Sequence, residues 1–297
     1  MQPPEILEWI CSYLTYHDLR RFRAVCRYVS EAASLLLFQQ IIFNVSDAAR
    51  LEKFLEGLIG QNRIAQHVRT LIVRDGNGNN FQARLARFIE ENPNLVSLKI
   101  DPRSWTTSFS LADALGTQPP KLIVLKVPSS TQINNTVIHG LAPSLRRLSF
   151  RGDQGKALWE AAGLRGAQIT CLNVLCRQVA TFTALLGYLR SYNGISILYL
   201  TLGADAKDEK LVEQLWTEAL PEHKETLSRL VVLDDTYHEN FHVKDSSNSF
   251  LGQCIRLRRL WVGVDLSIQR AGDPFAEVGS FVSFFRLPKS PHLQLKV

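Results

Sequence analysis

The residues with the most recognisable chemical spacing are His238, Glu239 and His242, which form a His-Glu-x-x-His pattern. On a helix, this pattern places two imidazoles on one face as zinc ligands, with the glutamate as general base of a metallopeptidase. Here aspartates precede the pattern and a Ser-rich, Asn-containing run follows it, so a long helix is not favoured. The next glutamate is the distant Glu277. We interpret the pattern as a polar loop between repeats and a zinc metallopeptidase as the remote alternative.

Other catalytic and metal-binding patterns are incomplete. Cys171 and Cys176 have no second Cys or His pair nearby, whereas a structural zinc site needs four such ligands. Gly76-Asn77-Gly78 is typical of a turn and lacks the third Gly and the Lys of a phosphate-binding loop. No Gly-x-Ser-x-Gly nucleophile motif occurs. We therefore predict a protein that is not an enzyme and holds no metal or cofactor.

Composition predicts a globular protein inside the cell. The 297 residues are 45% hydrophobic and 21% charged, which is ample for a buried core. The net charge of +6 is spread along the chain; it suits acidic partners and does not by itself indicate nucleic acid. Five irregularly spaced cysteines are typical of reduced thiols, and we find no signal peptide or membrane-spanning run. We expect a cytoplasmic or nuclear protein with no membrane or nucleic-acid partner.

The first forty-odd residues have the spacing of three short helices. Pro3-Pro4 suits a helix start, and apolar residues then recur at helical spacing. Thr15 and Asp18 predict a capping box for a second helix, and a third helix is expected from about Ser30 to Phe38. Helices this short bury too little surface to be stable alone. The segment therefore needs a partner, or it caps the repeat that follows it.

The same segment resembles the F-box motif. The matching residues, in order and spacing, are Pro3-Pro4-Glu5-Ile6-Leu7, Ile10, Tyr13-Leu14, Asp18-Leu19 and Val25-Cys26-Arg27. The stretch from Leu35 to Phe43 is similar to the segment that follows the motif in many fungal F-box proteins, and Tyr28-Val29 stand where many F-boxes carry a Trp. The resemblance covers residues 1–43 and implies binding to the Skp-type adaptor of a cullin-based ubiquitin ligase. The contacts that it implies are Pro3, Pro4, Ile6, Leu7, Ile10, Leu14, Leu19, Val25 and Cys26.

Residues 44–297 carry a repeat in which short Leu-x-x-Leu-x-Leu-like units begin 23 to 32 residues apart. Each unit predicts one strand, and helical patterns lie between units, as at Phe81–Glu91, Val179–Leu189 and Lys210–Leu220. Residues 292–297 predict the start of a ninth strand. The inward positions are Val68/Leu71/Val73, Leu95/Leu98/Ile100, Leu122/Leu125/Val127, Leu145/Leu148/Phe150, Ile169/Leu172/Val174, Ile195/Leu198/Leu200, Leu227/Leu230/Val232 and Leu257/Leu260/Val262.

These units resemble leucine-rich repeats, although they lack the Asn or Cys that usually follows the strand. The predicted fold is an α/β, leucine-rich-repeat-like solenoid of parallel strands with outer helices, preceded by a small all-α F-box segment. A single strand and helix cannot bury both apolar faces, but stacked neighbours can. The alternative is a doubly wound α/β domain, which is less favoured because no Gly-rich phosphate loop follows any strand.

In such a solenoid, the residues beside the inward leucines face the concave surface. Seven of them are cationic, two are aromatic and one, Asp101, is acidic. We hypothesise a site for an acidic or phosphorylated protein substrate, against the alternative that these are ordinary solvated charges. The two functions left open are a substrate receptor of a ubiquitin ligase and a repeat scaffold whose helical N-terminus is only a cap. The substrate-binding candidates are Arg74, Lys99, Lys126, Arg147, Arg151, Tyr199, Arg229, Arg259 and Trp261.

Overall fold

The computed structural model describes residues 4–44, 53, 56–57, 67–74, 81–101, 109–110, 115, 121–127, 131–132, 135–150, 155–206, 208–234, 250–262 and 294–295. The chain divides into two compact units, Met1–Gln132 (unit 1) and Ile133–Val297 (unit 2). The predicted helical segment therefore shares its unit with the first strands of the repeat. Among the described helices, none is both long enough and apolar enough to cross a membrane.

Unit 1 begins with the three helices expected from the sequence: α1 (Pro4–Tyr13), α2 (Tyr16–Phe22) and α3 (Arg27–Leu37). They pack around a small core of their own, which includes Leu7, Cys11, Leu19, Val29 and Ala33. The predicted cap of α2 is confirmed, because Thr15 Oγ1 accepts a hydrogen bond from the Asp18 backbone N–H at 3.2 Å. The same hydroxyl donates to the Asp18 carboxylate at 2.6 Å.

In the described part of the remainder of unit 1, four parallel strands follow in chain order: β1 (Gln40–Asn44), β2 (Thr70–Arg74), β3 (Ser97–Asp101) and β5 (Val124–Val127). Helix α6 (Phe81–Glu90) lies where a helix is predicted. Strands β4 (Phe109–Ser110) and β6 (Thr131–Gln132) form a separate parallel pair. Strand β1 differs from expectation, since it begins inside the predicted helical segment. Its β-branched Ile41 and Ile42 favour a strand, and Ile41 is buried.

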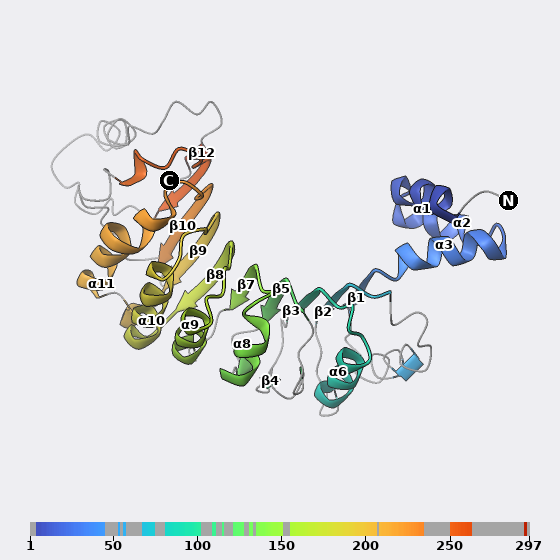
Figure 1. The fold of residues 1–297 in the computed structure, drawn as a ribbon, viewed down its shortest axis with the longest axis horizontal. Helices are drawn as coiled ribbons and strands as arrows, with labels where there is room; N and C mark the ends of the chain where they lie inside the picture. Colours follow the sequence, from blue (N-terminus) through green and yellow to red (C-terminus); the bar gives the residue numbers. More distant parts are fainter. Residues whose placement is uncertain are drawn as a thin grey trace. The chain divides into compact units, whose positions relative to one another are not determined.

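The described residues of unit 2 form six parallel strands, again in chain order: β7 (Arg147–Phe150), β8 (Cys171–Cys176), β9 (Ile197–Leu202), β10 (Arg229–Asp234), β11 (Arg259–Val262) and β12 (Gln294–Leu295). Strand β12 confirms the predicted ninth strand. The helices are α8 (Asn135–Leu141), α9 (Gly155–Leu164), α10 (Val179–Arg190) and α11 (Glu209–Gln214). The described connections also include a π-helical turn (Leu215–Ala219) and two 3₁₀ turns (Ala204–Ala206 and Leu220–His223). Helices α8 to α11 lie along one face of the strands (Figure 1).

A backbone hydrogen-bond ladder repeats at the start of successive strands. The carbonyl of Thr170 accepts from the N–H groups of both Ser196 and Ile197, and the carbonyl of Ser196 accepts from those of Ser228 and Arg229. In unit 1, three backbone carbonyls likewise each accept hydrogen bonds from two consecutive N–H groups at the start of the next strand. They are the carbonyls of Gln39, Arg69 and Val96. This recurrence indicates a solenoid-like α/β fold, in which each turn stacks on the previous one.

The predicted core positions are confirmed. All the inward residues of the eight units whose side chains are described are buried; only Val262 has a side chain outside the described set. The described strands of each unit follow one another in chain order without a reversal. The doubly wound alternative requires such a reversal and helices on both faces, so the structure contradicts it.

Candidate functional site

Some of the predicted adaptor-contact residues are buried inside the helical segment of unit 1, and others lie on its surface. Leu7 and Leu19 are buried in the core of the segment, so they stabilise its own packing and offer little surface to a partner. Ile10 and Leu14 are half-buried, whereas Ile6, Val25 and Cys26 are exposed. Pro3 lies outside the described residues, and only the backbone of Pro4 is described.

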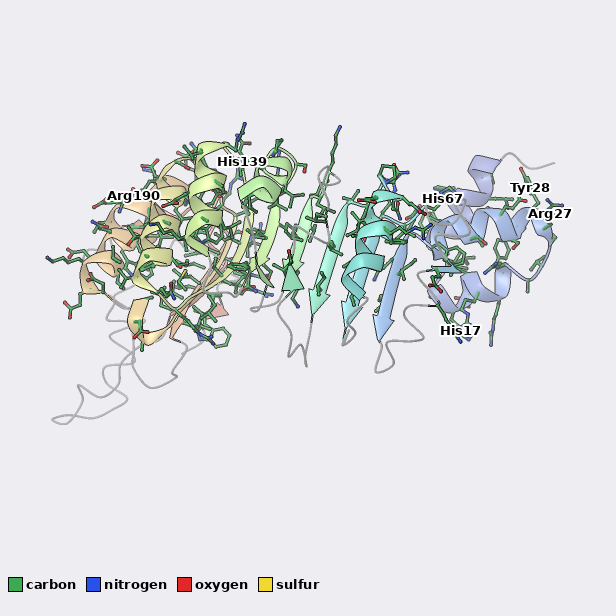
Figure 2. All side chains as sticks on the ribbon, turned by 90° about the horizontal axis from the view of Figure 1, so that it is seen from below. His17, Arg27, Tyr28, His67, His139 and Arg190 are labelled. Carbon is green, nitrogen blue, oxygen red and sulfur yellow. The ribbon has the colours of Figure 1, made fainter. Side chains whose placement is uncertain are left out.

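Large aromatic side chains add to this outer surface. Trp9 is 64% exposed and Tyr13 is 73% exposed, and their rings meet edge to face at 5.2 Å. Tyr28 is also exposed and lies with Arg27 at the periphery of the three helices (Figure 2). Sequence reasoning did not single out Trp9, although its spacing from Ile6 and Tyr13 puts all three on one face of α1. An exposed apolar cluster of this kind is typical of an interaction surface.

The candidate residues of the sheet in unit 1 form a smaller group. Lys99 and Lys126 are direct neighbours in register on β3 and β5, and both are half-buried. Arg74 ends β2 in register with Asp101, and the side chains of both lie outside the described set. Two lysines thus stand side by side on adjacent strands of this part of the sheet.

Five candidates come together on the sheet face of unit 2 that is opposite its helices. We call this surface the open face. Two rows of residues cross it in register. The cation row is Arg147, Cys171, Ile197, Arg229 and Arg259, and the aromatic row is Ser149, Asn173, Tyr199, Val231 and Trp261. Arg151, the remaining candidate, lies outside the described residues.

One contact fixes an arginine on the open face. Arg229 Nη1 donates a hydrogen bond to the Tyr199 hydroxyl at 2.6 Å, and its guanidinium carbon lies 5.9 Å from the centre of the same ring. Arg147 and Arg259 are exposed and make no ion pair with any described residue. No Asp or Glu occupies an open-face position on the described strands of unit 2. The face therefore carries an uncompensated positive charge within the described part of the chain.

Cys171 is the one group of the cation row that could act as a nucleophile. Burial raises the pKa of its thiol, and the nearby positive charges of Arg147 and Arg229 oppose that shift only in part. The thiol therefore stays protonated at neutral pH, and this site favours binding over covalent chemistry. Among the described residues, no group of three or more His, Cys, Asp or Glu side chains is placed to hold a metal ion. His238, Glu239 and His242 lie outside those residues.

The chain was compared with protein-family models, and no family model matches it. A search of curated proteins finds no similar sequence.

Proposed function

We propose that this chain is a non-enzymatic substrate receptor of a cullin-based (SCF-type) ubiquitin ligase. In this proposal, helices α1 to α3 form an F-box that binds the Skp-type adaptor, and the leucine-rich-repeat-like strands hold a protein substrate. The observation that carries the proposal is the outward placement of Ile6, Trp9 and Val25 on a helical segment that already has its own core.

The physical argument begins with exposed apolar area. Val25 is 68% exposed and, with Ile6 and the two aromatic side chains of α1, leaves a large apolar surface in water. Covering apolar area releases about 25 cal/mol per Å², so a partner that buries this surface gains a substantial driving force. Positive charge favours an acidic adaptor surface, and it is supplied here by three exposed arginines in α2 and at its C-terminal end, Arg20, Arg21 and Arg23.

The mechanism in this proposal is tethering. One part of the chain holds the ligase core, and the other holds the target. Proximity then raises the effective concentration of the target at the ligase, without any chemistry by the receptor itself.

Co-purification with a Skp-type adaptor tests the proposal. We expect wild type to capture the adaptor and Ile6→Asp and Val25→Asp to lose it, because each places a charge in the apolar contact. Leu164→Asp is the matched control, since Leu164 is 83% exposed on α9 in the other unit. Substitution of Leu7 is unsuitable, because Leu7 is buried and its loss would disturb the helical core. If wild type fails to capture the adaptor, or all variants capture it equally, the proposal is wrong.

The second candidate function is a repeat scaffold with a helical cap. One observation favours it: α3 ends at Leu37, and after two residues the chain enters β1 at Gln40. The carbonyl of Gln39 then begins the backbone ladder of the repeat. The helical segment is thus joined closely to the first strand, as a cap would be. Substrate capture without any adaptor binding would favour the scaffold.

A further inference from the structure

We propose that the open face of unit 2 binds an extended acidic peptide that crosses the strands. The first two carboxylates of this peptide are about four residues apart, and the third follows the second after one or two residues. This inference depends on the proposed receptor function only in treating the peptide as part of a substrate. Its basis is the register of the cation row, the contact between Arg229 and Tyr199, and the adjoining aromatic row.

Among the described residues, no acidic side chain compensates the charge of the cation row. Arg229 and Arg259 are direct neighbours in register on adjacent strands, and like charges placed opposite each other are unfavourable. No described open-face residue of unit 2 is acidic. An anionic ligand that lies across the row would relieve this repulsion and accept hydrogen bonds from the guanidinium groups.

The register sets the spacing of the anions. Arg147 and Arg229 are separated by three strand steps, through Cys171 and Ile197. Strands lie ~4.8 Å apart, so this separation is ~14 Å, the length of about four residues of extended peptide. From Arg229 to Arg259 is one step, which corresponds to one or two residues.

The aromatic row supplies apolar contacts beside the charges. Val231 is buried although it stands at an open-face position, and its neighbours in the row are Tyr199 and Trp261. Apolar side chains of the peptide that lie between its carboxylates would contact these rings. The Tyr199 hydroxyl also holds Arg229 in place before binding, which lowers the entropy lost when a ligand binds.

The spacing favours a peptide over a nucleic acid. A nucleic-acid strand carries a phosphate at every nucleotide. Here two uncharged residues, Cys171 and Ile197, separate the first cation from the second. A peptide can place its carboxylates at the ends of such a gap and an apolar residue over the middle.

Fluorescence anisotropy with the full-length chain tests the proposal. The probe is a labelled peptide whose glutamates have the predicted spacing, and the control peptide has the same composition in scrambled order. We expect the spaced peptide to bind about tenfold more tightly. Arg147→Glu and Arg259→Glu should each weaken it about tenfold, and Tyr199→Phe a few-fold. Lys156→Glu changes the net charge by the same amount as Arg147→Glu, but it lies on helix α9 and not on the open face. It should leave the affinity for the peptide unchanged.

Several results would overturn the proposal: no binding, equal binding of the scrambled peptide, or equal weakening by Lys156→Glu. Tighter binding of an oligouridylate that the same arginine variants weaken would identify a nucleic-acid site instead. Binding only after phosphoserine replaces glutamate would contradict the carboxylate assignment. Val25→Asp should bind the peptide as wild type does, so failure of the adaptor experiment and failure of this one are distinguishable.

Discussion

His223 Nδ1 accepts a hydrogen bond from the backbone N–H of Gly194 at 3.2 Å. Gly194 adopts a φ of 158° in the turn between α10 and β9, and His223 comes from the 3₁₀ turn that precedes β10. A side chain of one repeat thus fastens the turn of the previous repeat. The imidazole is buried, and desolvation lowers its pKa to about 4.

This contact predicts a loss of stability in mild acid. The pKa of His223 is about 4 in the folded chain and 6.5 in its ordinary form, so the unfolded state binds more protons between these values. The free energy of unfolding should therefore fall as the pH drops from about 6.5 to about 4, by at most ~3 kcal/mol. Urea unfolding across this range measures the effect. His223→Gln should flatten the profile, and His67→Gln, at an exposed site, should not. Parallel profiles for all three proteins would contradict this prediction.

A pair of glycines in neighbouring helices should respond oppositely to alanine. A Cβ at Gly155 would lie 2.8 Å from Thr181 Cγ2 and 2.9 Å from Trp159 Nε1, so Gly155→Ala should destabilise the fold by ~1–3 kcal/mol. A Cβ at Gly187 meets nothing within 4 Å, and Gly187→Ala in α10 should stabilise it by ~0.5–1 kcal/mol. Urea midpoints of both variants measure this. If both substitutions shift the midpoint in the same direction, the close packing of α9 against α10 is wrong.

The cysteines should separate by their rates of alkylation. Cys26 is exposed, whereas burial raises the pKa of Cys176 and Cys254 to about 12. Because the thiolate is the reactive form, iodoacetamide should modify Cys26 first and these two last under native conditions. Mass spectrometry of a time course measures the order, and unfolded protein, in which all thiols should react alike, is the control. Adaptor bound as proposed should also slow the reaction of Cys26; an unchanged rate would count against that contact surface.

The repeat could be predicted from the sequence, because its inward residues recur at every turn and each turn meets the same neighbours. The sequence did not allow us to predict which apolar residues of the helical segment are buried and which are exposed. Leu7 and Leu19 fit the apolar pattern as well as Ile6 and Val25 do, yet the first two are buried within the segment and the last two are exposed. Spacing on one helix does not say which apolar side faces a neighbouring helix and which faces solvent.

The contact between Arg229 and Tyr199 also could not be predicted from the sequence. Arg229 pairs in register with Ile197, and Tyr199 pairs with Val231, so the two side chains meet diagonally across β9 and β10. The repeat predicts that both residues face the same surface. Only the exact alignment of the two strands brings them together.

Tyr28 offers a test of the F-box resemblance at a single position. It is exposed at the start of α3, where many F-boxes carry a Trp, so a larger indole has room to project towards a partner. We expect Tyr28→Trp to bind the Skp-type adaptor a few-fold more tightly and Tyr28→Ala to bind it more weakly, because the contact area follows ring size. Titration calorimetry measures both affinities, and Tyr199→Phe, on the open face of unit 2, is the control that should not change them. If the Trp and Ala variants bind alike, this position does not contact the adaptor and the resemblance does not extend to α3.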